Sequence, residues 1–267
     1  GSGKTMLAMK KVQQFCDVGL NVLFVCFNSA LADYLETRLY DAKVANFHGL
    51  CHQAAVQLGR NVNRETDQKK LFEEMYPQIL LEFAEETGRV YDAIVGDEGQ
   101  DFHENYWIAL ESLLKSDGYL FIFYDDNQNI FHGSTSFGGL IQEAPFSLNQ
   151  NCRNTKFIHN TVMKFHSDPT GITSYAPEGR EPEWIIYDDT AGMNKALQKV
   201  LHRLVNEENV SSQDIVILTP KGMNRSSLKP GLKLGNFTLS DRSTAKPTDI
   251  MVTTIQRFKG LERKVVI

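Results

Sequence analysis

Residues 93–102 read AIVGDEGQDF, and this stretch decides the fold class that the sequence predicts. An apolar run ends directly in two carboxylates, Asp97 and Glu98. Short apolar runs of this kind are typical of strands buried on both faces of a parallel sheet. In open α/β sheets the ligand binds outside the carboxyl ends of the strands, so the two acids would lie where such a protein holds its ligand. A plain turn after a strand is the alternative, and these residues alone leave both open.

The chain begins with GSGKT, residues 1–5, which matches the second half of the phosphate-binding pattern G-x-x-x-x-G-K-[ST]. The first glycine of the pattern would precede residue 1, and a Gly-Ser-Gly linker followed by a chance Lys-Thr is the alternative. The next residues favour the loop. Apolar residues recur at helical spacing over 5–18, Gly19 is suited to end that helix, and NVLFVCF (21–27) is typical of a buried strand. This order forms part of a βαβ unit, which places phosphates at the helix N-terminus.

Composition predicts a soluble, globular protein. The chain has 267 residues, of which 42% are hydrophobic and 23% charged, and no run is long and apolar enough to span a membrane. Its four cysteines form no C-x-x-C pair, which predicts reduced thiols and a cytoplasmic location. The net charge of −5 argues against a surface coated with Lys and Arg for duplex DNA, but not against a local basic groove.

Strand and helix patterns alternate along the whole chain and predict an α/β fold with two parallel-sheet domains. We expect the first domain at residues 1–145, with a small helical insertion at about 51–90, and the second at 146–267. Pro77 would kink or break the insertion, and Trp107 would anchor the core of the first domain. The other expected elements are strands at YDAIVGDE (91–98), YLFIFYDD (119–126), EWIIYDD (183–189) and DIVILTP (214–220), helices near 154–166 and 191–206, and a loop-rich stretch at 221–247.

Five motifs occur in the order and approximate spacing seen in the UvrD/Rep/PcrA-like superfamily 1 helicases: GSGKT, DEGQDF, FYDDNQNIF, LNQNCRNT and TTIQRFKGLE. The chain resembles this family over essentially its whole length, apart from the helical insertion and residues 160–250, where only the strand pattern matches. The resemblance implies two RecA-like domains, truncated at both ends, with Mg²⁺-dependent ATP hydrolysis in the cleft between them. It also implies 3′→5′ movement along single-stranded nucleic acid, DNA in particular, and leaves room for fused domains beyond the termini.

The resemblance further implies roles in ATP hydrolysis for particular residues. Lys4 would bind the β/γ-phosphates, and Thr5 and Asp97 would hold Mg²⁺. Glu98 would activate the attacking water. Arg153 would reach the γ-phosphate from the second domain, where an ordinary surface arginine is the alternative. The other nucleotide-site residues that the resemblance implies are Gly1, Ser2, Gly3, Gln100, Gln128, Gly260 and Glu262, with the two glutamines coupling the γ-phosphate to the nucleic-acid site.

The residues that the resemblance places against the single strand are Phe27, Asn28, Phe47, His48, Phe131, Thr254 and Gln256. Aromatic side chains suit this task because every base has a π-face on which they can stack. Phe27 and Phe47 could equally fill the core, and this alternative stays open. His48, Cys51 and His52 could also be read as zinc ligands, but no second ligand pair follows at zinc-site spacing.

Two departures from the family pattern concern its aromatic residues. Cys152 stands where the family has the aromatic that stacks on adenine, and Cys26 stands at the aromatic of a strand-contacting segment. The change at Cys152 keeps a second hypothesis open, in which the chain is a nucleotide-dependent binding or regulatory module. Such a module would switch conformation with weak or no ATP hydrolysis and would not translocate.

Overall fold

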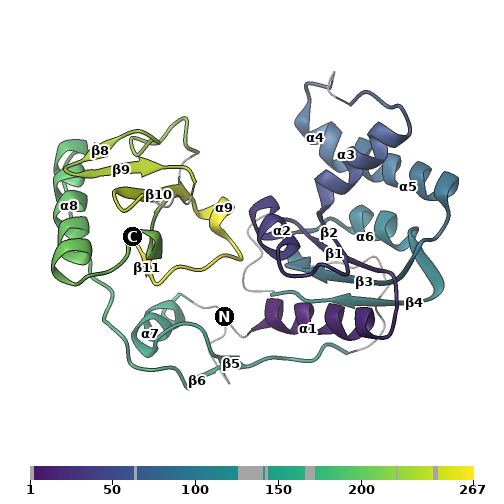
Figure 1. Ribbon diagram of the computed structural model, residues 1–267, viewed down its shortest axis with the longest axis horizontal. Coiled ribbons are helices and arrows are strands. Elements are labelled where there is room, and N and C mark those ends of the chain that lie inside the picture. Colours follow the sequence, from purple (N-terminus) through teal and green to yellow (C-terminus); the bar gives the residue numbers. More distant parts are fainter. Residues whose placement is uncertain are drawn as a thin grey trace. The chain divides into compact units, whose positions relative to one another are not determined.

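A computed structural model of the chain describes residues 3–62, 65–125, 141, 144–165, 172–220, 222–242 and 246–267. The chain divides into two compact units, Gly1–Pro182 and Glu183–Ile267. The domain boundary that the sequence predicts, after residue 145, falls inside the first unit, and the assignment of domains to 1–145 and 146–267 stays a prediction. The elements of both units are labelled in Figure 1.

The first unit is built around a four-stranded, all-parallel sheet in the order β2-β1-β3-β4. Its strands are β1 (Val22–Cys26), β2 (Lys43–Asn46), β3 (Tyr91–Asp97) and β4 (Leu114–Ile122). All five residues of β1 are buried, which explains its unbroken run of apolar side chains. The predicted α/β class with a parallel sheet is therefore confirmed for this unit.

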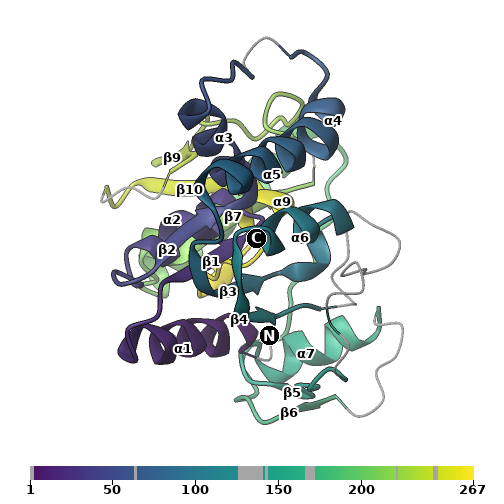
Figure 2. The same cartoon turned by 90° about the vertical axis from the view of Figure 1, so that its right-hand side faces the viewer.

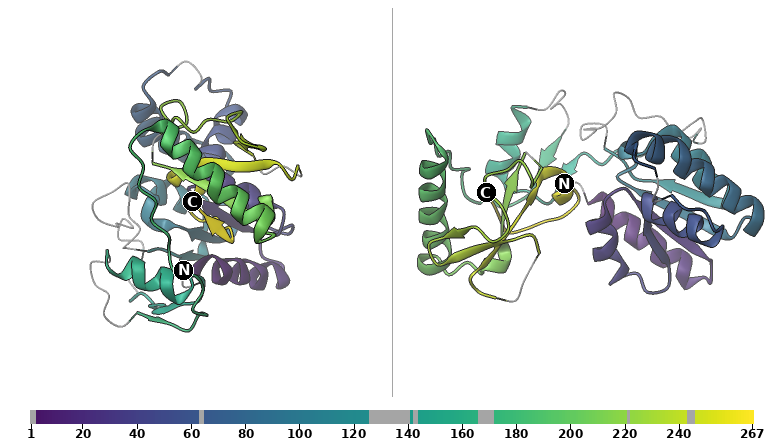
Figure 3. Two further views of the ribbon diagram at one scale, coloured as in Figure 1. Left: turned by 90° about the vertical axis from the view of Figure 1, so that its left-hand side faces the viewer. Right: turned by 90° about the horizontal axis from the view of Figure 1, so that it is seen from above.

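Helices cover both faces of this sheet. Helix α1 packs on one face, and α3, α5 and α6 pack on the other (Figures 1 and 3). None of the helices in the described ranges is both long and apolar enough to cross a membrane. The helical segments of the sheet region are α1 (Lys4–Asp17), α2 (Ser29–Glu36), α3 (Phe47–Gln57), α4 (Gln68–Lys70), a π-helical turn (Leu71–Met75), α5 (Tyr76–Thr87), a 3₁₀ turn (Gly99–Asp101) and α6 (Glu104–Glu111).

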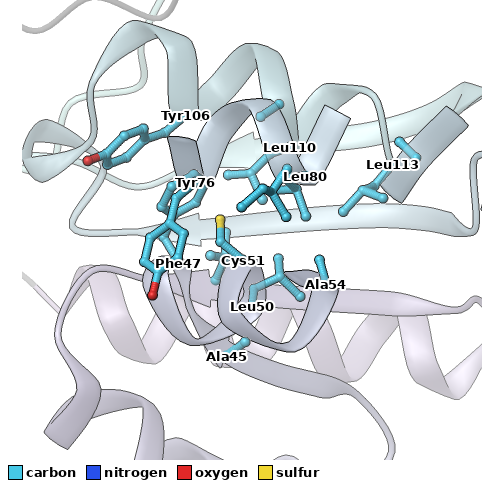
Figure 4. Close-up of a cluster of buried hydrophobic side chains, with 14 of the residues drawn as sticks. Ala45, Phe47, Leu50, Cys51, Ala54, Tyr76, Leu80, Tyr106, Leu110 and Leu113 are labelled. Atoms are coloured by element: carbon cyan, nitrogen blue, oxygen red, sulfur yellow. The ribbon is translucent and has the colours of Figure 1, made fainter. Parts of the chain in front are cut away.

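The core of the first unit lies between the sheet and the layer of α3, α5 and α6 (Figure 4). Phe47 stacks on Tyr106 with ring centroids 4.0 Å apart and an interplanar angle of 12°. Trp107 is fully buried, which confirms its predicted role as a core anchor. Pro77 lies at the start of α5, directly after the π-helical turn, and the helical backbone continues through it from Gln68. Proline has no N–H to donate to the Glu73 carbonyl four residues earlier, and the Asn105 side chain donates to that carbonyl instead.

The rest of the first unit contains two short strands and one helix among its described residues. The two-residue strands β5 (Gln150–Asn151) and β6 (Thr173–Ser174) pair in parallel. Helix α7 (Lys156–Met163) lies between them in the chain and is shorter than the helix expected near 154–166. Figure 2 shows α7, β5 and β6 together. Asn151 organises this group, because its buried side chain contacts His159 Nδ1 at 3.1 Å.

The second unit has a five-stranded sheet in the order β11-β7-β10-β9-β8, parallel except for the β8–β9 hairpin. Helix α8 packs on this sheet through Leu197 and Leu201, as expected from the pattern at 191–206. The elements are α8 (Thr190–His202), a π-helical turn (Arg203–Glu207), a 3₁₀ turn (Ser212–Asp214), β7 (Ile215–Thr219), β8 (Lys233–Leu234), β9 (Phe237–Ser240), β10 (Asp249–Thr254), α9 (Ile255–Phe258) and β11 (Val265–Val266).

One local prediction for the second unit is wrong. EWIIYDD (183–189) forms no strand, and Trp184 and Ile186 are 77% and 94% exposed. Its β-branched and aromatic residues favour a strand, but a strand also requires a neighbour to pair with, and none of the described strands pairs with this segment. The stretch at 221–247 is loop-rich in its described residues, as predicted, so only the EWIIYDD strand is wrong; the stretch also contains the short β8–β9 hairpin, whose Leu234 and Phe237 are buried.

Candidate functional site

The N-terminus of α1 lies beside the carboxyl ends of β3 and β4, as contacts of Thr5 and Lys4 show. Gly3 precedes the helix with φ 83° and ψ 17°, a left-handed conformation that glycine adopts without steric cost. No described side chain caps this terminus. The first turn of a helix leaves backbone N–H groups without intrahelical partners, and these groups favour an anion.

Asp97 is the last residue of β3 and is only 2% exposed. The Thr5 side chain lies close to the Asp97 carboxylate and favours its ionised form. Burial, followed by the nearby charge of Glu98, raises the pKa of Asp97 from 3.8 to about 6, although Thr5 and Lys4 oppose the shift. The Oδ2 atom of Asp97 has no hydrogen-bond partner among the described residues. A buried carboxylate oxygen without a partner is a position where a cation would be stabilising.

Glu98 follows in a strained conformation. Its φ of 55° and ψ of 42° lie in the left-handed region, which is uncommon for residues other than glycine. Gln100, only 1% exposed, donates from Nε2 to Glu98 Oε2 at 2.6 Å. The Asp125 backbone N–H in turn donates to Gln100 Oε1 at 2.8 Å. Gln100 therefore ties the Glu98 carboxylate to the segment that follows β4.

Lys4 forms an ion pair with Asp125, with Nζ 2.8 Å from Oδ2. The two side chains are 23% and 19% exposed, so solvent screens the pair only in part. Asp125 was not among the predicted site residues, although it lies within the FYDDNQNIF motif. One signal could have identified it. An acid that follows a buried strand lies at the same edge of a parallel sheet as Asp97.

These groups combine into a site that can bind an anion together with a divalent cation. Thr5 and Asp97 offer hard oxygen donors, which Mg²⁺ prefers. Among the residues that the structure describes, no three His, Cys, Asp or Glu side chains gather as a metal site. A cation held here would therefore complete its coordination with water and with oxygens of a bound anion. Asp125 is paired with Lys4, and Glu98 is a further carboxylate that could accept a proton.

The residues predicted to contact a single strand separate into two groups. Phe47 is fully buried in the core, which is the alternative that the sequence left open. Phe27 is half-buried and meets His48 edge to face, with ring centroids 5.3 Å apart. Asn28 caps α2 by accepting a hydrogen bond from the Ala30 N–H at 2.9 Å. Phe27, Asn28 and His48 follow the carboxyl ends of β1 and β2, the edge at which Asp97 lies.

His48 lies in an aromatic cluster with Phe27, Phe47, Phe72 and Tyr106. It stacks on Phe72, with ring centroids 4.5 Å apart and an interplanar angle of 27°. Burial, followed by the charge of His103, lowers the pKa of His48 to about 4, so the imidazole is neutral at pH 7. The zinc alternative gains no support. Cys51 is buried with a raised thiol pKa, and it forms no metal cluster with the two histidines among the described residues.

The remaining predicted residues lie elsewhere or outside the described part. Arg153 is exposed on a turn that Asn151 organises, since Asn151 Oδ1 accepts from the Arg153 N–H at 3.2 Å. In the second unit, Thr254 is buried and caps α9, whereas Gln256 and Glu262 are exposed and Gly260 has φ 83°. The predicted residues outside the described ranges are Gly1, Ser2, Gln128 and Phe131.

No protein-family model matches the chain, and no curated protein is significantly similar to it in sequence. The candidate site is therefore defined by the geometry of Lys4, Thr5, Asp97, Glu98 and Gln100. Cys16, Cys26, Cys51 and Cys152 are free thiols.

Proposed function

We propose that the chain is the motor core of an ATP-dependent translocase or helicase that acts on single-stranded DNA and resembles the UvrD/Rep/PcrA-like family. The observation that carries the proposal is the convergence of Lys4, Thr5 and Asp97 at the carboxyl edge of the parallel sheet. These residues come from two motifs that the sequence separates widely. A chance Lys-Thr after a linker would have no reason to meet the acid of the second motif.

Each residue of the site would have a defined task. Lys4 and the first-turn N–H groups of α1 would neutralise phosphate charge, and Thr5 and Asp97 would hold Mg²⁺. The bound Mg²⁺ supplies charge neutralisation at the phosphates. Glu98 would orient the attacking water and accept its proton, and Gln100 would fix the Glu98 carboxylate through the 2.6 Å hydrogen bond. Positioning and charge neutralisation are most of what phosphoryl transfer requires.

The proposal includes two RecA-like domains, with Arg153, Gly260 and Glu262 completing the nucleotide site and Thr254 and Gln256 contacting the strand. Phe27, Asn28 and His48 would contact the strand from the first domain. Their position at the edge that also carries Asp97 supports this, because strand contacts and hydrolysis could then influence each other directly. The four free thiols favour the cytoplasm as the location of such a motor.

The test is ATP hydrolysis with Mg²⁺, measured with and without single-stranded DNA. Lys4→Met and Glu98→Gln should each lower the stimulated rate by about 100-fold or more, because each removes charge stabilisation or a general base. Lys115→Met and Glu82→Gln are matched controls, since both remove surface ion pairs at Asp92 and Arg60. Hydrolysis that continues unchanged in both site variants would end the proposal.

The second candidate is a nucleotide-dependent binding or regulatory module with little hydrolysis. The exposed Cys152 favours it, because the family's adenine-stacking aromatic is absent at this position. Tight ATP binding with negligible turnover, even at saturating single-stranded DNA, would support the module. Turnover that rises many-fold with single-stranded DNA would exclude it.

A further inference from the structure

We propose that Asp125 competes with phosphate for Lys4. In the nucleotide-free chain its carboxylate holds the ammonium group that a phosphate would otherwise bind, so that Asp125 sets the affinity for polyphosphates. This inference rests on the proposed nucleotide site and adds to it a residue that lowers affinity. The ion pair with Nζ and Oδ2 2.8 Å apart is the observation behind it.

The backbone of Asp125 is anchored independently of its side chain. Its N–H donates to Gln100 Oε1 at 2.8 Å, and Gln100 in turn holds Glu98. The side chain can therefore release Lys4 without disturbing the hydrogen bonds that position Glu98. A substitution at Asp125 that keeps the backbone N–H should likewise leave Gln100 and Glu98 in place.

Charge repulsion explains why the Asp125 carboxylate must release Lys4 when a polyphosphate binds. Asp97 and Asp125 both interact with Lys4, and the charge of Glu98 already raises the pKa of Asp97. A di- or triphosphate adds several negative charges at the same place. Attraction to Lys4 is therefore shared between Asp125 and the phosphates, while Asp125 and the phosphates repel each other. Replacing the carboxylate by an isosteric amide removes both the competition and the repulsion.

The experiment compares the wild-type chain with D125N. Dissociation constants for ATP, ADP, adenosine and inorganic tripolyphosphate are measured by calorimetry, with and without Mg²⁺. We expect D125N to bind ATP, ADP and tripolyphosphate about ten-fold more tightly, as for a partly buried ion pair. Adenosine affinity should not change. A general structural effect would not separate the polyphosphates from adenosine in this way.

D92N is the matched control, because Asp92 pairs with Lys115 at the opposite end of β3. Its affinities should equal those of the wild type. If D125N does not fold, D125S takes its place in the comparison, because D125S removes the same charge. If the wild type binds polyphosphates clearly and a folded Asp125 variant binds them no more tightly, this inference is overturned and the proposed function is not. If neither protein binds nucleotide or tripolyphosphate, the proposed function is overturned with it.

Discussion

The indole of Trp107 lies directly over the backbone of Gly96. A Cβ atom at Gly96 would come within 2.4 Å of the Trp107 ring, closer than non-bonded atoms approach. A Cβ atom at Gly99 would lie 2.5 Å from Ile122 and 3.3 Å from the same ring. The two glycines of the AIVGDEGQDF stretch therefore allow α6 to pack closely on the end of β3. This packing fixes the strand end from which Asp97 and Glu98 project.

Gly96→Ala should destabilise the chain by about 1–3 kcal/mol, because Trp107 is fully buried and must shift to admit a methyl group. Urea unfolding followed by circular dichroism measures the change. Gly222→Ala is the control, since its Cβ would meet only the exposed Asn224 side chain at 3.1 Å. If the Gly96 variant is as stable as this control, the close packing of Trp107 is not a constraint.

The buried Asp97 predicts a stability that falls as the pH rises. Its folded pKa of about 6 lies above the ordinary 3.8, so the folded state holds a proton that the unfolded state releases between these values. The stabilisation is complete below about pH 4 and is lost once the pH exceeds 6. Two pKa units correspond to at most about 3 kcal/mol. Asp97→Asn should remove this dependence and be more stable than wild type at pH 8.

Urea unfolding at pH 5 and pH 8 checks this expectation by comparing Asp97→Asn with the wild type. The advantage of the variant should grow with pH. Mg²⁺ and ATP should stabilise the wild type and so reduce the advantage of the variant, because a bound cation stabilises the ionised Asp97 carboxylate. An advantage that is the same at both pH values would show that Asp97 is not held in a low-dielectric site.

The sequence predicted β1 and β3 of the first unit well because these strands contain unbroken buried apolar runs. Runs such as NVLFVCF contain the signal for such a strand within a few residues, and β1 and β3 lie where these runs predict them. The short β2 was missed, since its four residues are too few to show a pattern. EWIIYDD failed for the opposite reason, because a strand-like composition does not specify a pairing partner.

The candidate site was predictable in part. Lys4, Thr5 and Asp97 were identified because each has its place in a recognisable motif. Asp125 was missed because its pairing with Lys4 spans 121 residues and depends on the order of strands in the sheet. Phe47 could not be distinguished from Phe27 by sequence, since burial depends on how α3 and α6 pack together.

The buried His48 predicts that the free energy of unfolding decreases as the pH falls in the acid range, which is opposite to the effect of Asp97. Its folded pKa of about 4 lies below the ordinary 6.5, so stability is complete above 6.5 and is lost as the pH falls towards 4. His48→Phe should retain the stacking on Phe72 and weaken this acid sensitivity by about 2 kcal/mol. Urea unfolding at pH 4.5 and 7, in the Asp97→Asn background, isolates the effect. The exposed His52→Gln serves as control and should behave like its parent.

Phe27 and Phe47 are predicted to respond differently to truncation. Phe47→Ala should cost about 3–5 kcal/mol of unfolding free energy, since the ring is fully buried and stacked on Tyr106. Phe27→Ala should leave the fold largely intact and weaken single-stranded DNA binding by about five-fold or more, as the loss of one stacked base would. Fluorescence anisotropy with labelled oligonucleotides measures the affinity, and the exposed Tyr40→Ala is the control. Unchanged DNA affinity in a folded Phe27→Ala protein would remove this residue from the proposed strand path.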